Sequence, residues 1–328
     1  MIFDKKTVWS IGTLIALTCI LLLIFAPDFY SLTNLSIILT SMATTFLVGL
    51  GALFVMGTGS IDVSAGAIYG ITAIVAAQCS VSGLPGFLCI LIACLLGMFL
   101  GAINAVIVTV LRIPSIVATL GTASIFSGAL IFGTNGGAWV VGLPKDYVFF
   151  GSAHIFGIPV PVVLALFVGL FVQFIISETR FGREVFAVGS SLESSRLAGI
   201  PIRQVQAAVF CINGAFLGLA AAVVAARLGQ AQTNLGDNIT LTAITLAVVG
   251  GVSAFGGTGS VIGILLATIL VELTGSALIF LHVDPIWNKT MQGIFILAAL
   301  LVSAIDLNKR KSFISRLIVN INRGSNGR

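Results

Sequence analysis

Two carboxylates could do chemistry in this chain because each lies within a long apolar run. Asp62 follows the glycine-rich stretch Gly57–Ser60, and Glu272 is surrounded by apolar residues. A charge at the centre of a bilayer costs about 2.5 to 3.5 kcal/mol, so such a group normally faces a cavity or a partner. The pair could couple transport to an ion gradient, although a proton relay needs several carboxylates in one path. A structural alternative is that Asp62 caps the next helix through the amide of Ala65 or Gly66.

Groups for enzymatic chemistry are scarce. His154 and His282 form no His-x-x-x-His pair, and no Ser-x-x-Lys or Gly-x-Ser-x-Gly nucleophile motif occurs. The tetrapeptide Gly-Thr-Gly-Ser occurs at 57–60 and again at 257–260, but neither copy has the lysine of a phosphate-binding loop. The five cysteines show no metal-ligand spacing, which indicates reduced structural residues. The sequence therefore predicts no enzyme, and no ATP, metal or other cofactor bound by this chain.

The composition indicates which elements must position these residues. Apolar residues make up 58% of the 328, charged residues only 8%, and the mean hydropathy is +1.16, whereas soluble proteins are about 25% charged. A bilayer core needs about 20 apolar residues per helix. We therefore predict an all-α, polytopic membrane bundle with about ten transmembrane helices, nine or eleven remaining open. The runs are 8–26, 35–56, 64–81, 86–110, 113–133, 160–176, 205–226, 239–250, 261–281 and 287–305.

The distribution of basic residues predicts the orientation, because cytoplasmic loops are enriched in lysine and arginine. With both termini in the cytoplasm, only Lys145, Arg227 and Lys289 of the 16 basic residues lie outside. The segment 177–204, which holds seven of the 27 charged residues, is then a cytoplasmic loop. The scattered positive charges suit lipid headgroups and do not form a nucleic-acid site.

Glycine spacing predicts close helix contacts. The repeated Gly-Thr-Gly-Ser, separated by 200 residues, indicates either an internal repeat with interrupted helices or tight packing. Small-x-x-x-small faces are expected on packed helices at Gly66 and Gly70, Gly97 and Gly101, Gly214 and Gly218, and Gly259 and Gly263.

Several of these stretches resemble a known family. Residues 56–66 are similar to the Gly-Gly-Ile-Asp-Leu-Ser-Val-Gly motif of membrane permeases from ABC importers for ribose and similar monosaccharides, with Ser60 in place of the second glycine. Residues 113–122 follow the family's Pro-x-Ile-Val-Thr-Leu-Gly-Thr pattern. The resemblance spans nearly the whole chain and continues in order through 179–183, 196–200, 226–228 and 247–251.

The resemblance implies that a short cytoplasmic coupling helix docks on an ATPase subunit that binds the ATP. It corresponds to residues 189–200 here, where Ser190 or Ser191 could cap a helix and Pro201 could end one. The residues expected to act in this coupling are Gly189, Leu192, Glu193, Arg196, Leu197, Gly199 and Ile200.

The resemblance also implies a bacterial inner-membrane location, a second permease, identical or similar, and a periplasmic binding protein. We expect that receptor to contact the outer loop 135–159 through Trp139 and Lys145. Residues 136–139 and 285–288 look similar to permeases for rhamnose-type deoxysugars and autoinducer-2, which suggests a polyhydroxylated cargo of monosaccharide size. The translocation pathway is expected to include Ser60, Asp62, Ser64, Asn104, Thr119, Thr122, Asn213 and Glu272.

Residues 1–308 are expected to form the permease domain and 309–328 a basic cytoplasmic tail. Two other functions stay open at this point. The first is an ion-coupled secondary transporter that uses Asp62 and Glu272 and works without an ATPase. The second, an intramembrane enzyme, lacks paired catalytic groups.

Overall fold

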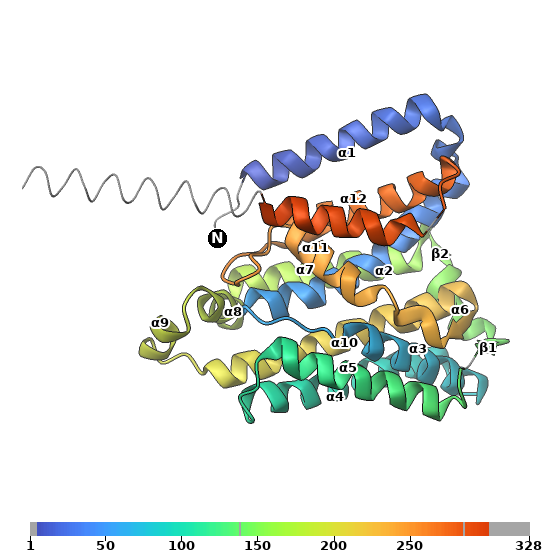
Figure 1. Ribbon diagram of the computed structural model, residues 1–328. Coiled ribbons are helices and arrows are strands. Elements are labelled where there is room, and N and C mark those ends of the chain that lie inside the picture. Colours follow the sequence, from blue (N-terminus) through green and yellow to red (C-terminus); the bar gives the residue numbers. More distant parts are fainter. Residues whose placement is uncertain (1–4, 138, 285, 302–328) are drawn as a thin grey trace, which may run out of the picture.

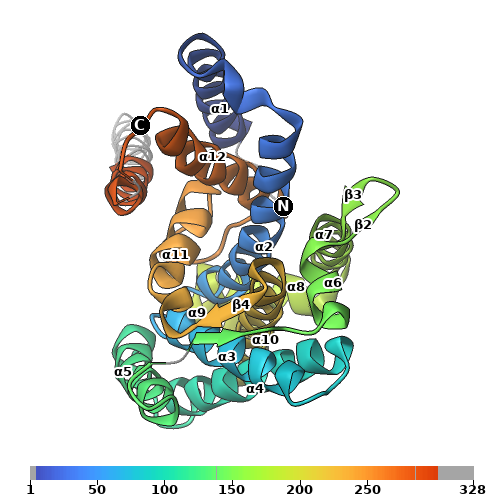
Figure 2. The same cartoon turned by 90° about the vertical axis from the view of Figure 1, so that its right-hand side faces the viewer.

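The protein is a bundle of helices with two small pieces of β-structure (Figures 1 and 2). The computed structural model describes residues 5–137, 139–284 and 286–301. Its α-helices are α1 (Lys5–Phe25), α2 (Leu32–Gly57), α3 (Ala65–Val81), α4 (Gly86–Thr109), α5 (Ser115–Gly133), α6 (Lys145–Ser152), α7 (Val160–Glu178), α8 (Arg180–Ser190), α9 (Leu192–Leu197), α10 (Ile202–Leu228), α11 (Ile239–Val249) and α12 (Val261–Phe280). The shorter elements are the 3-10 helices η1 (Pro27–Tyr30) and η2 (Thr233–Gly236) and the strands β1 (Trp139–Val141), β2 (His154–Ile155), β3 (Ile158–Pro159) and β4 (Gln230–Gln232).

The predicted all-α membrane bundle is confirmed, because every apolar run overlaps a helix within the described residues. Within the described residues, α2, α4, α5, α7, α10 and α12 are long and apolar enough to cross a bilayer. Helix α3 is shorter, and α11, with 11 residues, spans only about 17 Å. Residues 287–301 are helical up to the end of the described chain. The count of ten crossings therefore stays a prediction, and the tail at 309–328 lies outside the described residues.

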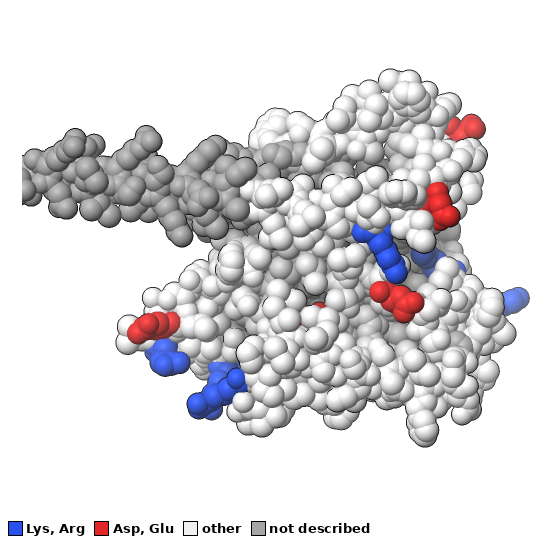
Figure 3. Space-filling model, viewed as in Figure 1, with Lys and Arg blue, Asp and Glu red and all other residues white. Residues whose placement is uncertain are grey.

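The helices run between two ends of the bundle that carry different elements. Helices α8 and α9 lie at one end, here called the α9 end, whereas α6, β1 and β2 lie at the other, here called the α6 end (Figure 1). On the face shown in Figure 3, lysine, arginine, aspartate and glutamate gather mostly toward these ends, with a largely uncharged band between them. An uncharged band flanked by charged ends is the surface expected of a protein that spans a bilayer.

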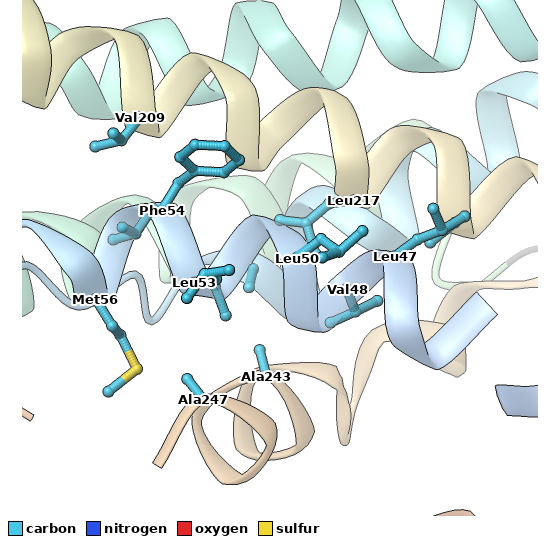
Figure 4. Close-up of a cluster of buried hydrophobic side chains, with 14 of the residues drawn as sticks. Leu47, Val48, Leu50, Leu53, Phe54, Met56, Val209, Leu217, Ala243 and Ala247 are labelled. Atoms are coloured by element: carbon cyan, nitrogen blue, oxygen red, sulfur yellow. The ribbon is translucent and has the colours of Figure 1, made fainter. Parts of the chain in front are cut away.

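Helix α2 is the centre of the core. Leu47, Leu50 and Leu53 are completely buried, and Figure 4 shows α2 between α10, which contributes Val209 and Leu217, and α11, which contributes alanines. Every residue of α2 from Phe46 to Gly57 is apolar and buried, so this half of the helix is suited to a position enclosed by other helices.

Helices α4 and α10 are in close contact through glycine. Gly97 and Gly101 of α4 face Gly214 and Gly218 of α10. A β-carbon added to any of the four would lie closer than 3.0 Å to a backbone carbonyl oxygen of the opposite helix. The small-x-x-x-small faces predicted at these positions are thus confirmed as one helix-to-helix contact.

Candidate functional site

The chain is not helical between α2 and α3, and this break lies inside the protein. Gly59 has φ +76°, a conformation that glycine adopts without strain. The freed backbone amides are bonded by side chains: Ser115 accepts from the amide of Ile61 at 3.1 Å, and Thr119 from that of Val63 at 2.9 Å. Because water is absent at membrane depth, such substitutes are what permit a helix to stop there.

Asp62 is at the centre of a buried hydrogen-bond network. Its Oδ1 accepts from the amide and the hydroxyl of Ser64, at 2.9 and 2.6 Å, and its Oδ2 accepts from the side-chain amide of Asn213 at 2.8 Å. Asn104 donates to the Ser64 hydroxyl at 2.7 Å and accepts from Thr122 at 2.6 Å. The network therefore joins the break to α4, α5 and α10.

The expected cap of α3 by Asp62 has a different form in the structure. The carboxylate bonds the amide of Ser64, one residue before the two amides that we named. The amide of Gly66 donates instead to Thr240 of α11 at 3.0 Å, and the same hydroxyl donates to the carbonyl of Val63. Asp62 thus holds the turn that precedes α3, and α11 supplies the hydroxyl at the helix start.

Of the eight side chains expected along a pathway, seven lie in or beside this network and are buried. They are Ser60, Asp62, Ser64, Asn104, Thr119, Thr122 and Asn213. The side-chain contacts within the network satisfy most of its polar atoms internally. The arrangement holds four segments together, and a role in translocation stays a prediction.

Glu272 is in a separate polar cluster nearer the α6 end. It accepts from the Thr45 hydroxyl at 2.5 Å, and one turn away on α2 the Ser41 hydroxyl accepts from Arg227 at 2.5 Å. The Nε of Arg227 is buried without a partner among the described residues. Sequence reasoning missed Arg227, Ser41 and Thr45. Arg227 directly follows the apolar run 205–226, which forms most of α10, and this position was the available signal.

The segment 177–204 contains the two helices α8 and α9, which are separated by Ser191 alone. Thr179 caps α8 by accepting from the amide of Gly182, and Ser191 caps α9 by accepting from that of Ser194 at 3.2 Å. Helix α9 covers only Leu192–Leu197, shorter than the 189–200 that we expected. It ends there because Gly199 turns the chain with φ +74° before α10 begins.

Five of the seven residues expected to act in coupling are exposed around α9. Leu197 is 85% and Leu192 52% exposed, and Glu193, Arg196 and Gly199 are exposed as well. Ile200 is half-buried and packs against the core. The exposed apolar and charged side chains make α9 a surface that no described part of the chain covers.

Gly189 lies in α8 and packs inward, away from this surface. A β-carbon there would be closer than 3.0 Å to the carbonyl oxygen of Gly57 and the nitrogen of Gly257. The nitrogen of Gly257 also donates to the Gly57 oxygen at 3.0 Å. The two Gly-Thr-Gly-Ser copies therefore touch at the α9 end, and α8 is packed onto both. Their local structures differ, since Ser260 caps α12 while Ser60 caps no helix.

At the α6 end, Trp139 and Lys145 are both exposed. Strand β1 pairs antiparallel with β4, and the Trp139 indole donates to Gln230 at 2.8 Å. Lys145 begins α6 and lines an open cleft of about 470 Å³ with Phe87 and Phe149. Within the described chain, no three histidine, cysteine or acidic side chains lie close enough together to hold a metal ion.

The chain is similar over most of its length to a family of known membrane permeases. The family described as "Branched-chain amino acid transport system / permease component" matches residues 34–300. The autoinducer 2 import system permease protein LsrC of Yersinia pseudotuberculosis serotype O:1b (strain IP 31758) is 33% identical over 309 residues, covering 92% of this chain and 88% of that protein. Its namesake from Photorhabdus laumondii (strain TT01) is 32% identical over 319 residues, covering 95% of each chain. No solved structure matches this chain.

Proposed function

This chain belongs to the family of branched-chain amino acid transport system permease components, and from that membership we propose that it is the membrane-spanning permease subunit of an ATP-binding-cassette importer. The observation that carries the proposal is α9, a short capped helix whose exposed leucines and charges have no partner among the described residues. In this proposal a separate ATPase subunit covers that surface and supplies the energy. The chain itself catalyses no reaction.

The junction around Gly189 supports a mechanism for transmitting the motion. Helix α8 directly precedes α9 and touches both Gly57, at the end of α2, and Gly257, in the loop before α12. Because backbone packs on backbone there, a displacement of α9 has no flexible side chain to absorb it. We expect movement of the ATPase to reach α2, the Asp62 network and α12 together, and so to alternate access to the pathway.

The proposed cargo is a neutral, polyhydroxylated molecule of monosaccharide size, a rhamnose-type deoxysugar or autoinducer-2 among the candidates. The relatives named above import autoinducer 2 by their descriptions. The buried hydroxyls and amides around Asp62 are of the kind that bind hydroxylated solutes, provided that the network opens during transport.

The other partners follow from the exposed elements. In the proposed orientation the α9 end faces the cytoplasm, and a periplasmic binding protein delivers the solute to the α6 end, where Trp139 and Lys145 are exposed.

A second permease completes the pathway. Helix α5 is the candidate for that contact, since its exposed residues include Gly121, Ser124 and Gly128 beside large apolar side chains such as Leu120 and Ile125. The bacterial inner membrane is the proposed location.

An ion-coupled carrier is the alternative, and the geometry disfavours it. Asp62 bonds Ser64 and Asn213, whereas Glu272 bonds Thr45, so in the described parts of the chain the two carboxylates share no hydrogen-bond partner. A proton relay requires its titrating groups to be linked in one path.

The test of the proposal removes the charges of α9. In Glu193→Ala plus Arg196→Ala, we expect co-purification of the ATPase and ATP-dependent uptake of labelled ribose, rhamnose or autoinducer-2 to fall at least about tenfold, the usual effect of losing charged anchors from an interface. The matched control is Arg180→Ala plus Glu184→Ala, which removes an ion pair of 2.6 Å from α8. Its effect on ATPase binding should be small, because both residues lie in α8 one turn apart and outside the α9 surface.

Two results would contradict the proposal. One is an equal loss of ATPase co-purification and uptake in the control variant Arg180→Ala plus Glu184→Ala. That result would assign the effect to the loop as a whole. The other is uptake that needs no ATPase and follows a proton or sodium gradient, which would make Asp62 and Glu272 the centre of the mechanism.

A further inference from the structure

The loop between α6 and α7 contains a small β-hairpin that packs on little else. Strands β2 and β3 pair antiparallel, His154 with Pro159 and Ile155 with Ile158. The two residues of the turn, Phe156 and Gly157, have φ +51° and +81°. Positive φ at both positions is the geometry of a tight two-residue hairpin turn, but phenylalanine rarely adopts it. The hairpin thus holds a large aromatic side chain at its tip.

The tip is apolar and uncovered. Phe156 is 101% exposed, and the flanking Ile155 and Ile158 are 43% and 47% exposed. The four residues from 155 to 158 carry no charge. An exposed apolar tip of this kind in an extramembrane loop marks a contact with something outside the chain.

The hairpin continues directly into a helix face that is suited to lipid. In the membrane span of α7, the strongly exposed side chains are all large and apolar: Val163, Leu166, Phe167, Leu170, Phe171 and Phe174. Helix-to-helix contacts in membranes are instead enriched in small residues, and the small residues Ala165 and Gly169 of α7 are buried on its other side. The face of α7 is therefore a lipid-facing surface, and the hairpin extends it at the α6 end.

The direction of the hairpin agrees with this. Figure 2 looks onto the α6 end of the bundle, and there β2 and β3 project sideways beyond α7, away from the paired strands β1 and β4 at the centre. Helix α7 has 19 residues and spans about 28 Å, close to the thickness of a hydrocarbon core. The hairpin, which precedes its first residue, therefore lies at the level of the lipid headgroups.

We infer that the hairpin tip, Ile155 to Ile158, inserts into the membrane interface beside α7 and that its partner is the lipid surface. In the proposed orientation this is the outer leaflet. Aromatic side chains stabilise proteins at this depth. The loop 135–159 then divides its contacts, with β1 facing the aqueous side over the centre of the bundle and the hairpin facing lipid. This inference depends only on the chain spanning a membrane, and it holds whichever solute is carried.

The experiment places the photo-crosslinking residue benzoylphenylalanine at position 156 of the full chain, reconstituted in nanodiscs of phosphatidylethanolamine and phosphatidylglycerol. The same residue at Phe167, in the middle of α7, is the positive control for lipid, and Trp139 in β1 is the matched aqueous position. The substitution keeps an aromatic group at a fully exposed site, so folding should be unchanged. After irradiation, intact-mass spectrometry measures the fraction of chain that carries a phospholipid.

We expect lipid adducts at 156 within about threefold of those at 167 and at least about tenfold above those at 139. Repeating the irradiation in native membranes tests the other occupants. A protein adduct at 156, either with a soluble binding protein or with a second copy of the chain, in place of lipid would overturn the inference. So would an absence of lipid adducts at 156 when position 167 gives them.

Discussion

Replacing Gly214 with alanine is expected to destabilise the bundle strongly, because the added methyl group has no space. It would lie closer than 3.0 Å to both the carbonyl oxygen and the carbonyl carbon of Gly97. Those atoms belong to the backbone of α4, so relief requires the two helices to move apart. Overpacking of this kind costs about 1 to 3 kcal/mol, and we expect a value near the upper limit, which corresponds to a lower apparent Tm by roughly 5 to 10 °C.

The measurement is thermal unfolding of the purified chain in nanodiscs. Gly12→Ala is the matched control, since Gly12 is also a helical glycine, in α1, but has nothing within 4 Å of an added β-carbon. Alanine favours helix by up to about 1 kcal/mol over glycine, so the control should melt at the same temperature or slightly higher. Equal melting temperatures for the two variants would show that α4 and α10 are not in close contact.

Changing Asp62 to alanine is expected to reduce uptake to less than about one tenth, whereas changing it to asparagine should largely preserve it. Alanine leaves the Ser64 hydroxyl and the Asn213 amide without their acceptor in the buried interior, and each unsatisfied group costs about 1 to 3 kcal/mol. Asparagine retains one oxygen for Ser64. Its amide nitrogen can donate to Asn213 if that side chain turns over.

The pair of variants also separates the two mechanisms for transport. Among the described residues the one ion pair joins Arg180 and Glu184, so Asp62 has no paired cation that its neutralisation would leave unpaired. An ATP-driven permease therefore tolerates the loss of charge. An ion-coupled carrier that uses Asp62 needs the negative charge of this residue, so uptake in Asp62→Asn would then be as low as in Asp62→Ala. The measurement is uptake by proteoliposomes with ATP inside or with an imposed ion gradient, after the folded fraction of each variant has been equalised by gel filtration.

Much of the fold could be predicted because the membrane imposes it. A helix is the only open-chain segment that satisfies its own backbone in lipid, so apolar runs of about 20 residues became helices close to their predicted bounds. Glycine spacing predicted the close-packing faces of α4 and α10, though not that the two would meet, for a similar reason: lipid provides no hydrophobic force between helices, which leaves close packing as the means of association. The cap at Ser191 was predictable too, since capping is local.

The partners of the polar residues could not be predicted in this way. Asp62 and Asn213 are 151 positions apart, and helix periodicity does not specify which helices are neighbours. The sequence suggested one pathway that included Glu272, but the fold gives Glu272 a different partner on α2 and adds Arg227 nearby. The sequence predicts that Gly189 belongs to the surface around α9. In the structure it packs inward, because Gly57 and Gly257 meet next to α8.

By itself, then, the sequence determined the membrane class, the helices and the family, because these depend on apolar length, local capping and motifs in order along the chain. Only the tertiary structure decided which polar groups meet, that α8 packs on both glycine-rich breaks, and that the hairpin at Phe156 points sideways. The physical reason is that a buried hydrogen bond is specified by the position of its partner in space, and residues such as Ser64, Asn104 and Asn213 are brought together by packing forces spread over the whole bundle.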